Sequence, residues 1–579
     1  MASHPKEPDS GYVYGGAIYN KGKQTITKSI FVNNSAYSYS NEAWGGAIAN
    51  MGADAEQVIK DSIFSGNSVS TKDDYSSTYY SSDGNSYGGA ISNRMGTQTI
   101  TNSIFTNNSV DSTDSWANGG AVYNYQGTQT ISGSIFKNNS ATSTYNAYGG
   151  AVYNEGSGST VTMQLITDSV FVGNIASHSG GAVFNRIGNQ LIDNSLFDGN
   201  KVVSNGYAYG GAVGNDSGSY SDRVQIINNS IFVNNTASST YSANYTVEGG
   251  AIRNNSGWQV ITDSQFINNG AICSSSSGGA FGGGIFIGNG TTTTLVAQDK
   301  DILFEGNYVS SKGSETKTPD AIYMYDNSNA VLNLNASAGR SIIFNDRISS
   351  YSSLAAIHIN NTGTWDNSTD IFKDMYLSNS VPVSAGTTGT IELNEDMSGY
   401  RGNVYIYGGT VKVGWDRTNT YGQAVTPKFF NSGYTNIAAA ATVDLVNGKA
   451  TDSITGVHGN GSLLIDVDPA AGITDNFSLY SSSQGGQLIL KGINFLSDVD
   501  GESASLTVGS GAGSFVPFKL DYTNIYTNGN SYALSTTNGK ILTITKASTF
   551  DSFQDAFKSD GANKYFNFSA NEYFGNSSE

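Results

Sequence analysis

The carboxylates that recur at one fixed position in this 579-residue sequence are Asp61, Asp168 and Asp263. Each stands two residues before the residue that precedes a recurring phenylalanine. Glycoside hydrolysis needs two carboxylates about 5 to 9.5 Å apart, and a calcium site needs several around one ion. The three belong to the second, fifth and eighth copies of a repeat, so stacking at about 4.8 Å per copy would separate neighbours by roughly 14 Å. They are too far apart to cooperate, and we expect no catalytic residues.

A candidate nucleophile is Ser217, within the segment GNDSGSY at Gly214 to Tyr220. This segment resembles the nucleophile region of serine-protease autotransporters. In the repeat it aligns with an insert at Tyr153 to Thr160, and no trypsin-like module precedes it. A catalytic triad also needs a histidine that orients and deprotonates the serine. The four histidines are scattered, at His4, His178, His358 and His458, so we interpret Ser217 as a turn residue.

Metal and phosphate chemistry find little support. The acidic spacing of Asp498 to Glu502 suits weak calcium binding but lacks the later ligands of a full loop, so a solvated turn is favoured. The glycine-rich stretch at Gly278 is not followed by the Lys-Ser/Thr pair of a phosphate-binding loop. Cys273 is the single cysteine, which excludes an internal disulfide and a cysteine-based zinc cluster. We expect no cofactor and no metal ligand.

Charge and hydropathy argue against two further classes of protein, those that bind nucleic acid and those that span a membrane. The chain has 29 Lys and Arg against 47 Asp and Glu, a formal net charge of -18, which would repel a phosphate backbone. No run of about 18 apolar residues occurs, and the N-terminus shows no apolar signal-peptide region. We therefore expect no nucleic-acid partner and no membrane span. The Ser-, Thr-, Asn- and Gly-rich texture favours the mature segment or a fragment of an exported protein.

Two short motifs alternate eight times. The first is Gly-Gly-Ala-[Ile/Val]-x-Asn, and the second is Gln-x-Ile-x-x-Ser-x-Phe-x-x-Asn. The first motif begins at Gly15, Gly45, Gly88, Gly119, Gly149, Gly180, Gly210 and Gly249. The second begins at Gln24, Gln57, Gln98, Gln129, Gln164, Gln190, Gln225 and Gln259. A fixed period of this kind indicates a repeat architecture.

The spacing inside the motifs predicts three short strands per copy. Gln24 and Ile26 share one strand face, Ser29 and Phe31 share another, and a bend falls at Thr27 and Lys28. One copy is too small to bury its apolar side, so the copies must stack, with Ile and Phe in continuous internal rows. Gly-Gly and the closing Asn suit corners. The prediction is an all-β parallel β-helix with coils of about 22 residues plus inserts. A leucine-rich solenoid and a propeller are disfavoured.

The alternating GGA[I/V] and FxxN tetrapeptides resemble those of the polymorphic outer-membrane proteins, a group of autotransporter adhesins. They stand first at Gly15 to Ile18 and Phe31 to Asn34. The segments Gly389 to Gly414 and Gly456 to Asp468 are similar to later passenger regions. The resemblance covers about residues 11 to 545. It implies a right-handed β-helix that is exported through the outer membrane for adhesion or autoaggregation, displayed at the bacterial surface or secreted.

The sequence divides into five parts. Residues 1–10 are expected to be a leader or remnant, 11–290 the regular repeats and 291–400 degenerate coils. Residues 401–546 alternate as broader coils or a capping sheet, and 547–579 are a tail with one short predicted helix.

Inserts between the closing Asn and the next Gly-Gly occupy the same place in every copy and must emerge along one edge. Insertions on one face of a solenoid often mark its binding face. Aromatic residues among Ser, Asn and Gly supply rigid contacts of the kind that binding loops use. The candidate binding residues are Tyr37, Tyr39, Trp44, Tyr75, Tyr79, Tyr80, Tyr87, Trp116, Tyr145, Tyr148, Tyr207 and Tyr209.

These features predict a surface adhesin passenger whose edge loops bind a host protein or glycan, or the same protein on a neighbouring cell. Two other interpretations remain. One is a β-helical polysaccharide lyase or hydrolase. The other is a structural stalk, in which the aromatic residues merely cover the edge of the helix.

Overall fold

The computed structural model describes residues 11–39, 41–72, 84–113, 115–158, 162–220, 222–240, 244–311, 313–326, 329–361, 388–479, 486–510, 518–527, 530–547 and 565–566. The chain divides into two compact units. The first comprises Met1–Leu295 with Ile302–Val331, and the second comprises Val296–Asp301 with Leu332–Glu579. Within the described residues the structure is almost entirely β, with one short 3-10 helix, η1 (Met397–Gly399).

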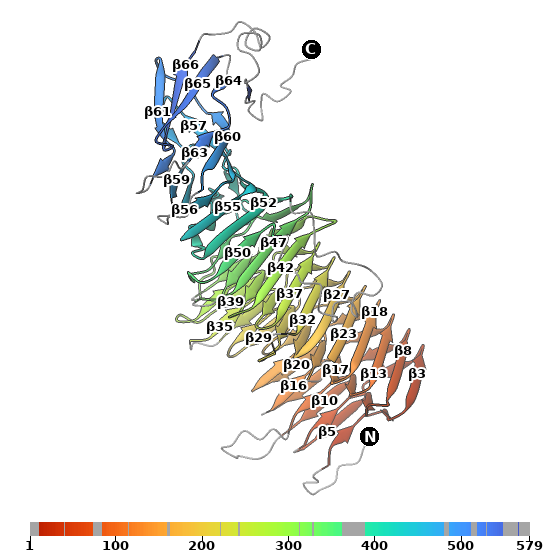
Figure 1. Cartoon of the computed structure of the whole chain (residues 1–579). Helices are drawn as coiled ribbons and strands as arrows, with labels where there is room; N and C mark the ends of the chain where they lie inside the picture. The colour runs from red at the N-terminus through yellow and green to blue at the C-terminus, as the bar shows by residue number, and fades with distance from the viewer. Residues whose placement is uncertain are drawn as a thin grey trace, which may run out of the picture. The chain divides into compact units, whose positions relative to one another are not determined.

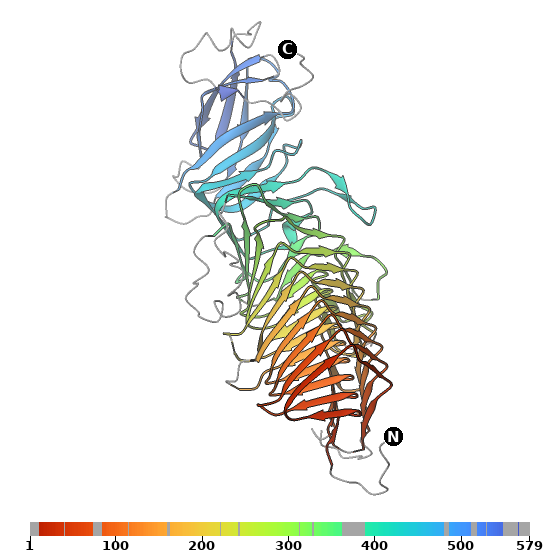
Figure 2. The ribbon, with the colours of Figure 1, turned by 90° about the vertical axis from the view of Figure 1, so that its right-hand side faces the viewer.

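The first unit is a parallel β-helix, which confirms the predicted fold class. Strands from successive copies pair in parallel and in register, so that equivalent residues lie side by side (Figure 1). Five rows of strands run along the stack, each named here after its first strand (Figure 2).

The β2 row contains β2 (Ile18–Asn20), β7 (Ile48–Met51), β12 (Ile91–Arg94), β17 (Val122–Tyr125), β22 (Val152–Glu155), β26 (Val183–Arg186), β31 (Val213–Asp216), β36 (Ile252–Asn254), β41 (Ile285–Ile287) and β46 (Ile322–Met324). The β3 row contains β3 (Lys23–Thr27), β8 (Glu56–Lys60), β13 (Thr97–Thr101), β18 (Thr128–Ser132), β23 (Thr162–Thr167), β27 (Gly188–Asp193), β32 (Val224–Asn228) and β37 (Trp258–Thr262). The β4 row contains β4 (Ile30–Val32), β9 (Ile63–Ser65), β14 (Ile104–Thr106), β19 (Ile135–Lys137), β24 (Val170–Val172), β28 (Leu196–Asp198), β33 (Ile231–Val233), β38 (Gln265–Ile267) and β43 (Ile302–Glu305).

The β5 row contains β5 (Ser35–Ser38), β10 (Ser68–Thr71), β15 (Ser109–Ser112), β20 (Ser140–Ser143), β25 (Ile175–Ala176), β29 (Lys201–Ser204), β34 (Thr236–Ser239), β39 (Gly270–Cys273) and β44 (Tyr308–Ser310), the last paired with the antiparallel β45 (Thr318–Pro319). The β1 row contains β1 (Val13–Tyr14), β6 (Ala43–Trp44), β11 (Ser86–Tyr87), β16 (Trp116–Asn118), β21 (Asn146–Tyr148), β30 (Ala208–Tyr209), β35 (Thr246–Glu248) and β40 (Gly279–Phe281).

The interior is filled by the predicted rows of isoleucine and phenylalanine. Ile59 to Ile261 are fully buried in every copy, and Ile26 at the end of the stack is 7% exposed. The phenylalanine rings stack face to face from Phe31 to Phe304, with centroids 4.7 to 5.0 Å apart. The conserved spacing of the two motifs therefore gives one continuous apolar core.

Buried amides form ladders beside this core. Each Asn in the series from Asn34 to Asn307 meets the next, as where Asn108 Nδ2 donates to Asn139 Oδ1 at 2.9 Å. The backbone N–H of Asn108 donates to the same oxygen at 3.0 Å. Two further ladders of side-chain amides follow the stack. In the β3 row Gln129 Nε2 donates to Gln98 Oε1 at 2.7 Å, and in the β2 row Asn124 Nδ2 donates to Asn154 Oδ1 at 2.8 Å. Buried polar groups need such partners, so the ladders fix the register between coils.

The two glycines of each Gly-Gly pair are needed for different reasons, the first for its backbone conformation and the second for lack of space. The first glycine of each pair has a positive φ, for example 71° at Gly119, where L side chains are strained. The second glycine has a negative φ but no room, since a β-carbon on Gly120 would overlap the carbonyl oxygen of Gly150 in the next coil. Both glycines are therefore required by the corner between the β1 and β2 rows.

Two details differ from the sequence prediction, namely the number of strands in a coil and the residue at the left-handed corner. A coil has five short strands instead of three, because residues such as Ser35–Ser38 and Ala43–Trp44 within the inserts also pair with their neighbours. The spacing of ladder residues, which includes the inserts, runs from 26 to 43 residues. The left-handed corner residue is the one before the closing asparagine, such as Asn33 (φ 55°). The side chain of Asn34 itself belongs to the amide ladder, where it donates to Asn67 Oδ1.

The second unit combines parallel strands with an antiparallel sheet. Its parallel strands are longer, above all β52 (Asn403–Val413) and β55 (Tyr434–Asp444). The others of this sheet are β47 (Val331–Ala336), β48 (Ser341–Phe344), β50 (Ala356–Ile359), β51 (Thr390–Leu393), β56 (Ser453–Gly459), β57 (Ser462–Asp468), β59 (Asn476–Leu479), β60 (Leu488–Phe495), β62 (Gly509–Ser510) and β63 (Phe518–Leu520), with β58 (Ile473–Thr474) antiparallel to β57.

The second sheet of this unit has the order β61 (Ser503–Thr507), β66 (Ile541–Lys546), β65 (Asn530–Thr537), β64 (Asn524–Thr527) and β67 (Tyr565–Phe566). Its first four strands are antiparallel, and β67 pairs in parallel with β64. A separate hairpin joins β53 (Arg417–Thr418) and β54 (Ala424–Val425), and β49 (Ile348–Ser349) lies before η1. Strands β52, β57 and β66 lie in the region 401–546 where alternation was predicted. The predicted helix after Ala547 lies outside the described residues.

A substitution at Asn139 tests how much the asparagine ladder contributes to stability. Replacing Asn139 with alanine leaves the carbonyl of Phe105 and the backbone amide of Asn108 without their buried partner, and it removes one of the two donors to Asn174 Oδ1. We expect destabilisation by about 2 kcal/mol or more in chemical unfolding followed by circular dichroism. Asn138→Gly is the matched control, because Asn138 is exposed and left-handed (φ 53°), so this change should cost little. Equal stability of Asn139→Ala and the wild type would contradict the ladder's role.

Candidate binding surface

In each coil the connection from the β5 row to the β1 row starts and ends at the same two rows of strands, so the described ends of these loops lie along one edge of the first unit. They begin after strands such as β5 and β20 and end before β6 and β21. The predicted position of the inserts is thus correct, although their ends belong to strands. The edge carries four of the candidate side chains in exposed positions: Tyr37, Tyr39, Tyr145 and Tyr207, between 38 and 48% exposed.

Three of the four exposed tyrosines have ring contacts with other tyrosines. The rings of Tyr37 and Tyr39 meet edge to face, with centroids 5.5 Å apart. Tyr207 stacks on Tyr209 at 5.7 Å and meets Tyr245 edge to face at 4.8 Å. Such pairs restrict side-chain rotation while leaving ring surface in contact with water. They are suited to bind a partner at low cost in conformational entropy.

Other candidates have a different place. Trp44 and Tyr87 are only 3% and 7% exposed and fill the outer corner between the β1 and β2 rows. Their rings lie 4.1 Å apart, and Tyr87 continues to Tyr123 at 4.6 Å and from there to Tyr153 at 5.4 Å. This corner cluster is an aromatic core on the outside of the coil. Its packing keeps Trp44 and Tyr87 from a partner's reach.

Charged groups close the corner cluster. The guanidinium of Arg94 lies 5.3 Å from the centroid of Trp44, and that of Arg186 lies 5.4 Å from Trp116. Arg186 pairs with Glu155 at 3.2 Å, and Tyr123 donates to the same carboxylate at 2.7 Å. Burial raises the pKa of Glu155 above its ordinary value. The arginines cover the rings, so the cluster stabilises the corner.

Tyr148 and Tyr209 extend the same corner. Burial raises the pKa of Tyr148 to about 12, and that of Tyr209 is raised as well, also by burial. His178 meets both rings edge to face, at 5.1 and 5.3 Å, and desolvation lowers its pKa to about 4. The histidine is therefore neutral near pH 7. Arg253 lies 3.9 Å over the ring of Tyr209.

Of the remaining candidates, Tyr75, Tyr79 and Tyr80 lie outside the described residues.

Ser217 and the recurrent carboxylates have structural contacts. Ser217 is 1% exposed, and its hydroxyl donates to the carbonyl of Ser256 at 3.2 Å. Asp168 stands at a left-handed bend (φ 51°) and accepts from Asn194 at 2.7 Å. Asp61 holds the same place in its coil (φ 50°). These residues shape turns, in agreement with the sequence interpretation.

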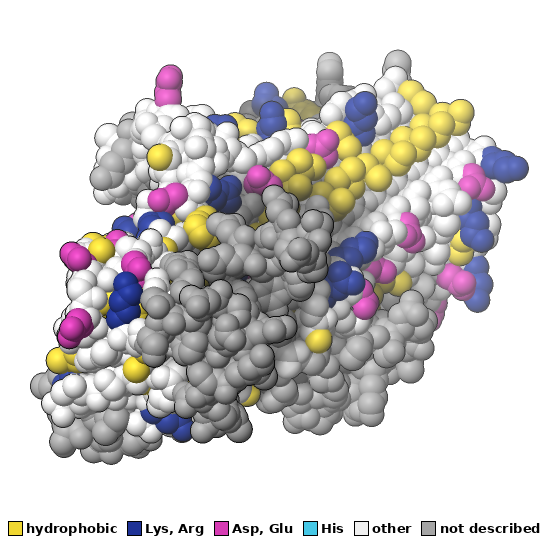
Figure 3. All heavy atoms as spheres, turned by 90° about the horizontal axis from the view of Figure 1, so that it is seen from above, with side chains coloured by type: hydrophobic (Ala, Val, Ile, Leu, Met, Phe, Trp, Pro, Cys, Tyr) yellow, Lys and Arg dark blue, Asp and Glu magenta, His cyan; other side chains and the backbone are white. Residues whose placement is uncertain are grey.

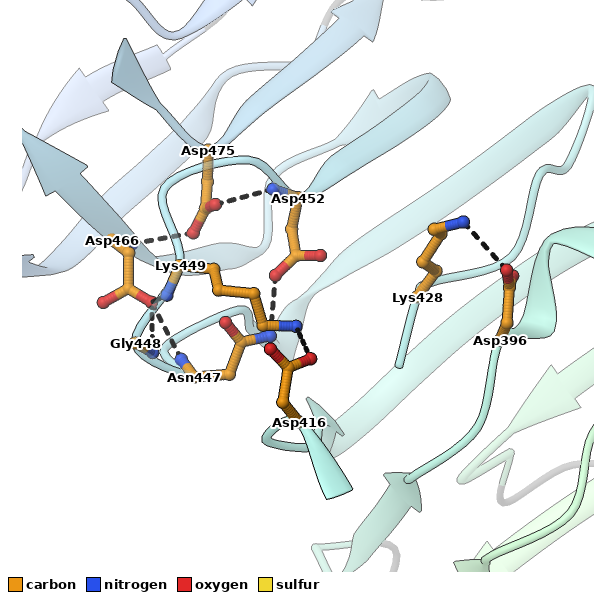
Figure 4. Close-up of polar contacts among 9 residues, drawn as sticks. All are labelled: Asp396, Asp416, Lys428, Asn447, Gly448, Lys449, Asp452, Asp466 and Asp475. Atoms are coloured by element: carbon orange, nitrogen blue, oxygen red, sulfur yellow. Dashed lines mark hydrogen bonds and ion pairs between the residues drawn. The ribbon is translucent and has the colours of Figure 1, made fainter. Parts of the chain in front are cut away.

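The sequence analysis did not predict a group of hydrogen-bonded carboxylates in the second unit (Figure 4). Asp466 Oδ2 accepts from three consecutive backbone amides, those of Asn447, Gly448 and Lys449, at 2.8 to 3.0 Å. Asp475 accepts from the amides of Asp452 and Asp466, at 2.9 and 2.7 Å. The amides that Asp466 binds belong to a turn 17 to 19 residues earlier in the sequence, and the alternation in LLIDVD does not reveal this contact.

The oxygens of this group are used to close backbone turns. Asp452 accepts from Asn447 Nδ2 at 2.6 Å, and Lys449 pairs with Asp416 at 2.7 Å (Figure 4). In the same view Lys428 pairs with Asp396 at 2.8 Å.

Throughout the described part of the chain, no three acidic, histidine or cysteine side chains are placed to hold a metal ion. Asp498, in the acidic segment that was interpreted as a solvated turn, lies 3.5 Å from Lys546 Nζ. Nor is any described helix long and apolar enough to cross a membrane.

Asp475 predicts a pH dependence. Burial raises its pKa from 3.8 to about 8, against the lowering effect of its two amide donors. A carboxyl whose pKa is higher when folded stabilises the fold below its unfolded pKa, and this contribution is lost as the pH rises through about 8. We expect the unfolding temperature of the wild type to fall between pH 4 and pH 8 more steeply than that of Asp475→Asn. The exposed Asp500→Asn is the control. Parallel pH profiles for Asp475→Asn and the wild type would contradict this.

Comparison with known proteins adds no family. No protein-family model matches the chain, and no curated protein matches it.

Proposed function

We propose that this chain is the passenger region of a cell-surface adhesin and that its edge loops attach to a protein or glycan on another surface. The observation that carries the proposal is the arrangement of Tyr37, Tyr39, Tyr145 and Tyr207. These exposed rings lie on the one edge where every coil can vary without disturbing the stack. Inward positions are occupied by the apolar rows and amide ladders, which leaves the edge for recognition.

The geometry favours attachment over hydrolysis. Two of the buried carboxylates, Asp466 and Asp475, accept from backbone amides. The exposed Asp61 and Asp168 belong to coils that are far apart in the stack. A β-helical polysaccharide lyase or hydrolase remains the alternative function, and detectable cleavage of acidic polysaccharides by the purified chain would establish it. In the proposed account the chain is displayed at a bacterial surface or secreted, and it needs no cofactor.

The proposal predicts a loss of attachment. The variant Tyr39→Ser/Tyr145→Ser/Tyr207→Ser should bind target cells at least about tenfold more weakly in a saturation binding assay, because three aromatic anchors are lost. Unfolding should be unchanged, since these side chains are exposed.

A matched control separates recognition from general stickiness. Tyr325 and Tyr351 are 46% and 60% exposed but do not belong to the edge loops. Their replacement by serine should leave attachment intact. Attachment that survives the edge-loop variant, or that falls equally in the control, would reject recognition by these loops and leave the stalk as the better account.

A further inference from the structure

The first coil of the β-helix has one side that no other described strand covers. Within the described residues β3 pairs only with β8, and β4 pairs only with β9, both of the second coil. The uncovered side of β3 and β4 is called here the N-terminal face, and it lies at the red end of the stack (Figure 1). An unpaired strand edge presents backbone N–H and C=O groups that can pair with a further strand.

Two amide ladders end at this face with polar groups that every inner coil uses. Asn67 Oδ1 accepts from the backbone N–H and the side chain of Asn34, at 3.0 and 2.8 Å. Asn34 Oδ1 holds the same place in the first coil, and no described donor reaches it. Gln57 Nε2 donates to Gln24 Oε1 at 3.0 Å, whereas Gln24 Nε2 has no acceptor among the described residues. The face therefore offers one acceptor and one donor in fixed positions.

The phenylalanine row also ends at this face. Phe31 is half-buried, whereas Phe64 of the second coil is fully buried, and the centroids of the two rings lie 4.8 Å apart. The other side of the Phe31 ring is the place where a further ring of the row would stack. A segment that satisfies both the ring and the ladder must carry an aromatic residue three positions before an asparagine, as the second motif does.

The charged side chains of the first coil are all basic. Residues 11–39 contain Lys21, Lys23 and Lys28 and no carboxylate. On the surface that Figure 3 views, basic and acidic side chains are mixed beside a long hydrophobic band. The second coil shows which charges fit the first, because Glu56 pairs with Lys23 Nζ at 2.8 Å and Asp61 holds the place of Lys28. Two identical N-terminal faces would bring lysines together, which disfavours a second copy as the occupant.

We infer that the N-terminal face binds an extended polypeptide segment, which adds in parallel to β3 and β4. The segment places glutamine opposite Gln24, phenylalanine opposite Phe31 and asparagine opposite Asn34. It carries carboxylates opposite Lys23 and Lys28. Main-chain hydrogen bonds give such strand addition its affinity, and the side chains at alternate positions decide which segment fits. The face is distinct from the edge loops, and the inference does not rest on the proposed function.

The chain itself supplies a probe for this face. Residues 56–67, EQVIKDSIFSGN, carry the required glutamine, phenylalanine and asparagine, with carboxylates at the two required positions. The experiment uses a labelled synthetic peptide of this sequence, blocked at both ends, and the whole chain as the receptor. Fluorescence anisotropy, with the chain varied from about 1 µM to about 1 mM, should show saturable binding.

Two altered peptides test the ladder and the ring. The peptide Phe64→Ser/Asn67→Ala should bind at least about tenfold more weakly than the probe, because it lacks both the ring and the amide. The peptide Val58→Thr/Ser65→Thr is the matched control, since it changes two outward positions to the residues that the third coil has there. It should bind as the probe does.

A charge exchange tests the register of the bound segment. With the wild-type chain, the peptide Asp61→Lys should bind more weakly than the probe, because its lysine would lie opposite Lys28. With the chain variant Lys28→Asp this order should reverse. The bend at Lys28 also accepts aspartate, as at Asp168, so the variant should fold. The chain variant Lys137→Asp changes an exposed lysine of β19 and should keep the wild-type order.

Three results would overturn the inference directly: no binding of the probe up to about 1 mM, equal binding of the Phe64→Ser/Asn67→Ala peptide, or an order of affinities that Lys28→Asp leaves unchanged. Binding that appears only after removal of residues 1–10 would also overturn it, because the face would then belong to the chain's own N-terminal segment. Dimerisation of the whole chain that the probe reverses would assign the face to a second copy instead.

Discussion

The structure of the first unit depends on buried amides that find their partners in the next coil. Asn108 illustrates the constraint: its side chain donates to Asn139 and to the carbonyl of Phe64, and its oxygen accepts from Asn67. A buried amide without these partners would cost more than the hydrogen bonds themselves contribute. Sliding one coil past another by a single residue would break the ladder and also turn the phenylalanine row outward. Polar and apolar rows therefore demand the same register.

This constraint divides the surface of the molecule by its freedom to vary. Inward positions are fixed in every coil, and the Gly-Gly corner admits no side chain at its second residue. The outer corner is also occupied, since the aromatic corner cluster packs there beneath Arg94 and Arg186. What remains free are the edge loops and the outward side chains of the strands.

The sequence predicted the parts of the fold that repeat. Eight copies of the same spacing indicated which side of each strand is buried, so the isoleucine and phenylalanine rows could be named residue by residue. The strands at Ser35–Ser38 and Ala43–Trp44 were missed because small and variable residues there show no pattern, and only pairing with neighbouring coils makes them strands. Trp44 and Tyr87 were grouped with the loop aromatics because sequence distance from a motif does not reveal an outer corner. Asp466 could not be predicted, since its partners come from a separate turn.

The central claim is that the coils are scaffold and that recognition takes place at the edge loops. Hydroxyl-radical footprinting of the attached chain, with modified tyrosines located by mass spectrometry, measures this directly. The account predicts that Tyr39, Tyr145 and Tyr207 are protected on attachment while Tyr325 and Tyr351 are modified as in the free chain. Equal modification of the three edge tyrosines in the attached and free chain would contradict it.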